Sequence, residues 1–280
     1  MTSRRTKSPL PAALVAVFLV LPLTAAAQSP GAEDLRQLSA DAAGCGPQPL
    51  ACNLGMLRRD LSAGDCHSGR GSYFDLYSFA VDPGEMVTAT VSSASFEGYI
   101  ALVDPGGRIV TQHKADPGEK AFLAYPAEAG GVYDLITSSA GAEALGGYDI
   151  ALGCLPVEAP AEPIPCTGAD GELCLSGGRF RVDTWWQTPD GRMGRGQGQQ
   201  IGDDSGFFWF FREGRAEVMV KAIDGCAVND HAWVFTAGMT NVHTAIRVTD
   251  TGTGASRWYF NPQTTGFKGV QDTTALANCG

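Results

Sequence analysis

Residues 74–91 read FDLYSFAVDPGEMVTATV and contain two short runs in which apolar residues alternate with polar or small ones. A period of two is typical of a β-strand that buries one face, and the aromatic and β-branched residues of both runs favour the same structure. Between the runs, Asp82-Pro83-Gly84 favours a tight turn. The stretch therefore predicts two antiparallel strands joined by a turn.

The same pattern returns along the whole chain, with turn sequences rich in Asp, Pro and Gly between the runs. In the first half the further runs are residues 99–103, 132–137 and 148–152. In the second half they are residues 179–186, 207–211, 216–223, 232–236, 242–249 and 257–260. Only residues 54–61 suggest helical turns. Many short strands at this spacing predict an all-β protein made of two β-sandwich, jelly-roll-like domains.

The ends and the middle of the chain differ in composition from these runs. A basic start, an apolar run and three alanines before Gln28 are typical of an export signal, and the polar stretch after it lacks any periodicity. Four prolines near the middle favour an extended linker, since proline cannot donate to a β-ladder. The expected order is a signal peptide (1–27), a disordered leader (28–44), a first domain (45–154), a Pro-rich linker (155–165) and a second domain (166–280).

The charge of the chain restricts its partners. There are 20 basic and 30 acidic residues, and three of the basic ones but none of the acidic ones lie in the signal, so the remainder carries a net charge of −13. Nucleic-acid binders gain affinity through Lys and Arg, and we therefore expect no nucleic-acid partner. No later apolar run is long enough to span a bilayer, so we expect no membrane insertion. The expected location is secreted or periplasmic.

Eight cysteines follow the signal, an even number that in an exported chain predicts disulfides. Their spacing lacks the pairs that zinc sites need. Eight cysteines allow 105 connectivities, and position along the chain favours one of them, with a bond between Cys66 and Cys154 closing the first domain. The predicted pairs are Cys66–Cys154, Cys45–Cys52, Cys166–Cys174 and Cys226–Cys279.

Four segments of the first half resemble one known family when taken in order. They are DxYxF at residues 75–79, FxxYIxLxDPxG at 96–107, GVY at 131–133 and GYxIxL at 147–152. Residues 52–154 thus resemble the bacterial pre-peptidase C-terminal domain, a jelly-roll-like β-sandwich that accompanies secreted peptidases. The resemblance implies an extracellular accessory or attachment role. We expect no peptidase ahead of the domain and therefore no proteolytic role.

The second half resembles a β module of unassigned activity at the C-terminus of exported bacterial proteins. The segments that carry this likeness are LCL at residues 173–175, GGRFRV at 177–182, GFFWFF at 206–211 and VTDT at 248–251. The resemblance implies an extracellular architecture and names no chemistry.

Sequence signatures of catalysis are absent: there is no GxSxG, HExxH, P-loop or GxGxxG after a strand. The four histidines lie far apart, so we expect no catalytic residue, no cofactor and no metal. Calcium remains an alternative, because Asp82, Asp104 and Asp116 lie in turns and related domains use calcium. Each precedes Pro and Gly, however, where an aspartate side chain caps the turn, and we prefer that interpretation.

Two aromatic groups stand out as candidate contacts. In FFWFF, residues 207–211, alternate rings point to opposite faces, which predicts a central strand buried on both sides. On the run 179–186, Phe180, Val182 and Trp186 define the buried face, so Trp185 points outward. Trp185 is therefore our candidate ligand-binding residue, for stacking on a sugar or anchoring a partner. The alternative is that it lies beneath the Gly-rich loop 191–198.

These observations favour a secreted, non-catalytic protein that binds an extracellular polysaccharide or protein. Two alternatives stay open. One is a secreted hydrolase whose active site has no recognisable sequence signature, and the other is a structural protein of the cell envelope.

Overall fold

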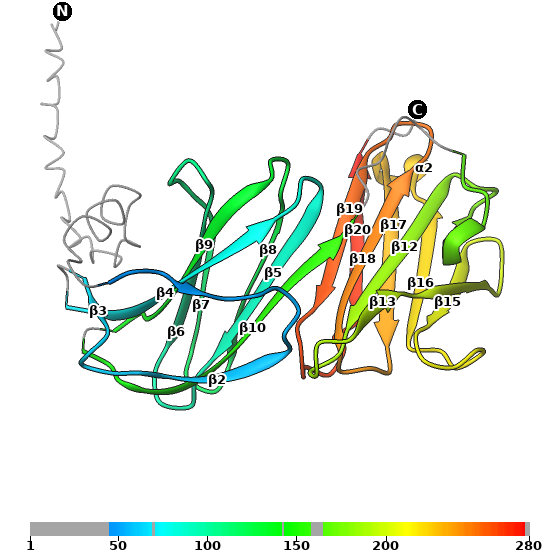
Figure 1. Ribbon diagram of the computed structural model, residues 1–280. Helices are drawn as coiled ribbons and strands as arrows, with labels where there is room; N and C mark the ends of the chain where they lie inside the picture. The colour runs from blue at the N-terminus through cyan, green and yellow to red at the C-terminus, as the bar shows by residue number, and fades with distance from the viewer. Residues whose placement is uncertain (1–44, 69–70, 142, 158–164, 278–280) are drawn as a thin grey trace, which may run out of the picture. The chain divides into compact units, whose positions relative to one another are not determined.

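The computed structural model describes residues 45–68, 71–141, 143–157 and 165–277 (Figure 1). The expected signal peptide, the leader, most of the expected linker and Cys279 lie outside these residues. The described chain is nearly all β, as predicted. Its helical segments are the one-turn η1 (Ala169–Gly171) and α2 (Cys226–Asn229). None of the helices in the described part is long and apolar enough to cross a membrane.

The first half forms two antiparallel sheets. One has the order β1-β4-β9-β6-β7, with β3 also paired to β4, and the other has the order β2-β10-β5-β8. The strands are β1 (Gln48–Pro49), β2 (Met56–Leu61), β3 (Cys66–His67), β4 (Tyr73–Val81), β5 (Glu85–Ser92), β6 (Gly98–Val103), β7 (Ile109–Ala115), β8 (Lys120–Pro126), β9 (Gly131–Ser139) and β10 (Gly146–Pro156). The one exception to the antiparallel pairing is β1, which runs parallel to β4.

The core of this sandwich comes from the alternation that the sequence displays. Phe79, Val87, Ile100, Leu135 and Ile150 are among the buried side chains that the two sheets contribute. Their alternate neighbours lie on the outer faces. The predicted strands over residues 74–81 and 86–91 are confirmed as β4 and β5, with the Asp82 turn between them closed by a hydrogen bond from Glu85 N to Asp82 O (3.2 Å).

A polar cluster lies inside this core. The Tyr148 hydroxyl donates to a carboxylate oxygen of Asp75, and it accepts from the hydroxyls of Tyr77 (2.7 Å) and Thr137 (3.1 Å). Burial raises the pKa of Asp75 above its ordinary value, and it raises the pKa of Tyr148 as well. Every hydroxyl in the cluster has a partner, which is the condition for burying such groups at low cost.

Two expectations about this half are wrong. Residues 54–61 form no helical turn, because MLRRDL pairs with β10 as β2 and buries Leu61 against the core. The last strand also continues beyond the expected domain end at Cys154. Leu155 pairs with Met86 of β5 and is fully buried, so the expected linker begins inside β10.

The second half forms two further sheets, β11-β12-β18-β19 with β13 on β12, and β14-β15-β16-β17-β20. The strands are β11 (Leu173–Leu175), β12 (Phe180–Gln187), β13 (Met193–Arg195), β14 (Gln197–Gln200), β15 (Ser205–Trp209), β16 (Val218–Asp224), β17 (His231–Gly238), β18 (His243–Asp250), β19 (Ser256–Asn261) and β20 (Val270–Ala277). Between the sheets lies a core that includes Phe180, Val182, Phe208, Val220 and Val248.

One segment of the second half belongs to both sheets. β13 pairs with β12 in one sheet, and β14, one residue later, pairs with β15 in the other. The residue between them is Gly196, whose N–H donates to Thr184 O (3.0 Å). A Cβ at this position would collide with the Thr184 hydroxyl and crowd Phe210, so the bend requires glycine.

The disulfides confirm one predicted pair and correct two. Cys166 is bonded to Cys174 as predicted, but Cys45 is bonded to Cys66 and Cys52 to Cys154. The predicted Cys66–Cys154 and Cys45–Cys52 bonds are therefore wrong. Cys226 is also disulfide-bonded, and its predicted partner Cys279 lies outside the described residues.

The parallel strand β1 explains the correction. Because β1 runs beside β4, it carries Cys45 to the edge where β3 holds Cys66, with 5.4 Å between the two Cα atoms. The chain then crosses to the other sheet, where Asn53 N donates to Leu152 O (2.9 Å) and Cys52 meets Cys154 at the end of β10. Disulfides of this kind persist in oxidising compartments, outside the cytosol.

Candidate functional site

Trp185 is not the exposed side chain that the sequence predicts. Its parity is right, since it lies on the face of β12 opposite Phe180 and Val182, but only 3 % of it is exposed. Met86, Leu155 and Val157 pack in the same apolar cluster, and the ring of Trp258 lies 5.5 Å away between centroids. A ring covered in this way cannot stack on a ligand, so Trp185 is withdrawn as a binding residue.

Beside Trp185 lies a buried cluster of charges. Asp183, 1 % exposed, accepts from Arg247 (2.9 Å) and Arg195 (2.7 Å), and Arg181 lies at 3.3 Å. The guanidinium groups of Arg195 and Arg247 also lie 5.4 and 5.1 Å from the Trp185 ring centre. Since these groups bind one another around one buried carboxylate, we assign the cluster a structural role.

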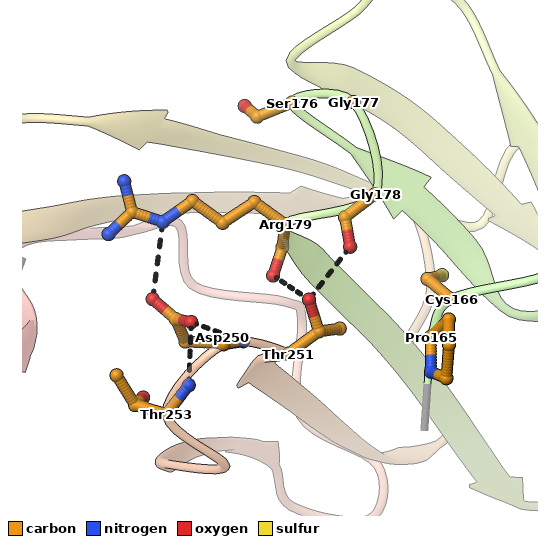
Figure 2. Close-up of a pocket in the computed structure, with 10 residues that line it drawn as sticks. Pro165, Cys166, Ser176, Gly177, Gly178, Arg179, Asp250, Thr251 and Thr253 are labelled. Carbon is orange, nitrogen blue, oxygen red and sulfur yellow. Dashed lines mark hydrogen bonds and ion pairs between the residues drawn. The ribbon is translucent and has the colours of Figure 1, made fainter. Parts of the chain in front are cut away.

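The pocket drawn in Figure 2 has a volume of about 590 Å³ and lies between the turn at residues 176–179 and the turn at 250–253. Its charged groups are already paired. Arg179 contacts Asp250 through Nε (3.2 Å) and Asp224 through Nη1 (2.7 Å), and Asp250 also accepts two backbone N–H groups. The Thr251 hydroxyl donates back to the turn, so no convergent open donors remain for a substrate.

The residues that could hold a metal do not suit one. Among the described side chains, Cys166, Glu172 and Cys174 form the one group of potential ligands whose atoms lie within 4.8 Å of one another. Both sulfurs are in a disulfide and cannot act as thiolates. The Glu172 carboxylate accepts from Thr167 N (2.8 Å) and Gly168 N (2.9 Å) and pairs with Arg181 (2.6 Å).

The three aspartates considered for calcium lie in the predicted turns. Asp104 caps its turn with its side chain, accepting from Arg108 N (2.9 Å), and its contacts with Arg108 lower the pKa of its carboxyl group. Asp82 and Asp116 close their turns through backbone carbonyls, which accept from Glu85 N and Glu119 N. The predicted side-chain cap is therefore confirmed for Asp104, whereas the closing bonds at Asp82 and Asp116 do not involve their side chains.

The histidines form no catalytic arrangement within the described chain, where none contacts a carboxylate. His243 is buried, and its Nδ1 donates to Asn261 O (2.9 Å), while Nε2 has no partner. Burial lowers its pKa to about 4. His231 Nδ1 contacts a backbone carbonyl, and His113 Nδ1 accepts from a backbone N–H.

The outer face of the β14-β15-β16-β17-β20 sheet carries partly exposed aromatic side chains. Phe208 and Phe210 enter the core, whereas Phe207 and Trp209 point the other way and are partly exposed. The prediction that residues 207–211 are buried on both sides is therefore wrong. We call this surface the aromatic face and define it by the outward side chains Gln197, Gln199, Phe207, Trp209, Met219, Lys221, Trp233, Phe235 and Gln271.

A glutamine lies opposite three of the rings. Gln199 pairs with Phe207 and Gln197 with Trp209 across β14 and β15, and Gln271 pairs with Phe235 across β20 and β17. Directly opposite residues point to the same side of a sheet. Each of these rings therefore has a neutral amide beside it.

The polar groups of the aromatic face are free to bind. Within the described chain, the side-chain amides of Gln197, Gln199 and Gln271 make no hydrogen bond, and the Trp209 indole N–H has no acceptor. Trp233 differs, since its Nε1 donates to Asn229 Oδ1 (2.8 Å). A glutamine amide offers two donors and one acceptor oxygen, so the face combines apolar ring surface with uncommitted hydrogen-bonding groups.

The aromatic face carries little net charge. Its one cation, Lys221, lies 3.1 Å from a carboxylate oxygen of Asp204, and Met219, beside it on β16, is 46 % exposed. Among the described residues, none of the four clusters of buried apolar side chains includes the rings of this face. The sequence contained one sign of it: Gln197 and Gln199, like Phe207 and Trp209, are spaced two residues apart, as side chains on one face of a strand are.

No protein-family model and no curated protein matches the chain. Three similar solved structures are distant. A pre-peptidase C-terminal domain of a Bacillus anthracis collagenase is 17% identical with a TM-score of 0.31, covering 38% of this chain and 94% of its own. A periplasmic inhibitor of g-type lysozyme from Aeromonas hydrophila is 11% identical, with a TM-score of 0.23 and coverages of 38% and 99%.

The third is a lipase from Bacillus licheniformis in its propeptide form, 13% identical with a TM-score of 0.24, covering 73% of this chain and 43% of the lipase. At such scores these likenesses assign neither activity nor ligand to this chain. The first of them belongs to the family that residues 52–154 resemble in sequence.

Proposed function

We propose that this chain is an exported, non-catalytic protein that binds an extracellular polymer through the aromatic face. The observation that carries the proposal is the row of partly exposed rings with uncommitted amides opposite them. A sheet face of this kind suits a long, repeating ligand, because many weak contacts add up along it. The pre-peptidase-like first sandwich fits an accessory role beside other exported proteins.

The other surfaces support a binding role less well. Asp183 is paired with Arg247, and, in a separate cluster, Arg179 is paired with Asp250. The Trp185 side chain is buried. The histidines of the described chain lack the acidic partner that would make one of them a general base. The predicted export signal and the disulfides support a ligand outside the cytosol.

The test is co-sedimentation of the purified protein with insoluble cellulose, chitin, peptidoglycan and collagen. The double variant Phe207→Ala/Phe235→Ala removes two rings of the aromatic face. Val132→Ala truncates a side chain that is 60 % exposed on β9 of the first sandwich, and serves as the control. We expect at least one polymer to retain the wild type and the control but not the double variant.

Equal retention of the wild type and the double variant on every polymer would overturn the proposal. Release of soluble sugars or peptides in proportion to added protein would overturn its non-catalytic part. Circular dichroism and the urea midpoint of each variant show whether it remains folded.

A further inference from the structure

We infer that the polymer bound by the aromatic face is an uncharged polysaccharide. The inference rests on the proposed function and narrows its ligand. It starts from the paired arrangement of rings and amides, in which Phe207, Trp209 and Phe235 each lie opposite a glutamine. A sugar ring has an apolar C–H face and a rim of hydroxyl groups, so one ring with one amide presents both kinds of contact that a sugar unit needs.

Several hydrogen-bonding side chains of the aromatic face are uncharged and have no partner within the described chain. The amides of Gln199 and Gln271 are exposed and make no hydrogen bond within the described chain, and the Trp209 indole N–H is likewise unused. Hydroxyl groups donate and accept, and so they can match amide N–H, amide oxygen and indole N–H together. A ligand without such groups would leave these atoms unpaired on binding, at a cost in free energy.

Charge excludes the common anionic polymers. The ammonium group of Lys221 is held by Asp204 at 3.1 Å, so the face offers no free cation. The chain after the signal also has a net charge of −13. Single-stranded nucleic acid stacks on aromatic rings as well, but it needs a positively charged groove along its backbone. An acidic polysaccharide would meet the same repulsion.

A folded protein is the weaker alternative. A protein partner would have to cover the amides of Gln197, Gln199 and Gln271 and supply a hydrogen-bond partner for each of them, or bury them at a cost. A polysaccharide supplies several hydroxyl groups per repeat, and water reaches the remaining groups at the rim.

The test compares retention on three uncharged polysaccharides, cellulose, chitin and starch, with retention on alginate, chitosan and collagen, at low salt and in 0.5 M NaCl, a salt level that strongly screens charge contacts. The variants are Trp209→Ala and Gln199→Ala/Gln271→Ala. Gln200→Ala is the matched control, because Gln200 is exposed on the same strand but its amide already donates to Gly202 O (2.9 Å).

We expect at least one uncharged polysaccharide to retain the wild type equally at both salt concentrations. Trp209→Ala and the double glutamine variant should each weaken this binding roughly tenfold or more, as the loss of a stacking or paired polar contact implies. Gln200→Ala should bind as the wild type does.

The outcomes separate the two proposals. Two results would overturn this inference and leave polymer binding intact. One is binding through the aromatic face to collagen alone. The other is binding through the face to a charged polysaccharide alone, lost in 0.5 M NaCl. Retention that no face variant changes would overturn both. Retention that falls with Trp209→Ala but stays unchanged in the double glutamine variant would also overturn the pairing of ring and amide argued here.

Discussion

Asp183 and Arg247 face each other across β12 and β18, and both Nε and Nη2 of the arginine donate to one carboxylate oxygen of the aspartate, at 3.3 and 2.9 Å. Asp183 also binds Arg195. One buried carboxylate thus contacts more than one guanidinium group.

Replacing Asp183 should strongly destabilise the protein. Asp183→Asn leaves buried cations facing a neutral amide, and breaking such a buried pair costs about 3–5 kcal/mol. The measurement is the free energy of unfolding in urea. Asp190→Asn is the control. The side chains of Asp190 and of its ion-pair partner Arg192 are both exposed, so the urea midpoint of this variant should equal that of the wild type. Equal midpoints for the two variants would contradict a structural role for the cluster.

The pKa of His243 predicts a loss of stability in acid. Burial lowers its pKa to about 4 in the folded protein, against about 6.5 when unfolded, so the unfolded chain binds the proton first. The neutral, buried imidazole therefore contributes about 3 kcal/mol to the free energy of unfolding above pH 6.5, relative to its contribution in acid. This stabilisation is lost as the pH falls to about 4.

The His243→Asn variant isolates this effect. Asparagine keeps a donor near the position of Nδ1 but does not titrate, so the stability difference between wild type and variant should shrink between pH 7 and pH 4. A difference that is constant with pH would show that His243 does not titrate as its burial implies.

Asp75 should act in the opposite direction. Its pKa is raised by burial, so the folded protein binds its proton more tightly than the unfolded chain does. The favourable contribution is present at low pH and is lost as the pH rises through about 3.8 and then through the raised folded pKa. In Asp75→Asn, which still accepts from Tyr148, the stability relative to wild type should therefore increase between pH 3 and pH 7. Parallel pH profiles would contradict this.

The two described disulfides that differ most in loop length should differ in their effect. Cys52–Cys154 spans 102 residues and Cys166–Cys174 spans 8. On the chain-entropy model their removal costs about 5 kcal/mol and between about 2 and 3 kcal/mol, respectively. The double serine variants of each pair test this by urea unfolding. A larger loss from the short loop would show that native contacts, and not chain entropy, dominate.

The sequence predicted strands and side-chain parity well, because both depend on neighbours along the chain. Phe208 and Trp185 each lie on the face of the strand that alternation predicts. What covers a face depends on residues far away. Trp185 is covered by Met86, 99 residues earlier, and by Leu155, 30 residues earlier. Nothing comparable covers Phe207 in the described chain.

Disulfide pairing failed for a related reason. Chain position favoured the ends of the first domain, Cys66 and Cys154, but the pairing is set by β1, a two-residue parallel strand with no alternation to reveal it. Once β1 lies beside β4, Cys45 reaches Cys66 and Cys52 is left for Cys154.

The bend at Gly196 has a mechanical consequence. Under the proposed function, a bound polymer under tension would pull on β14 through Gln197 and Gln199 of the aromatic face. Two residues before Gln197, the same backbone ends β13 at Arg195, which is bound to Asp183. Such a pull would therefore pass through Gly196 from one sheet to the buried Asp183 cluster of the other, and both sheets would share the load.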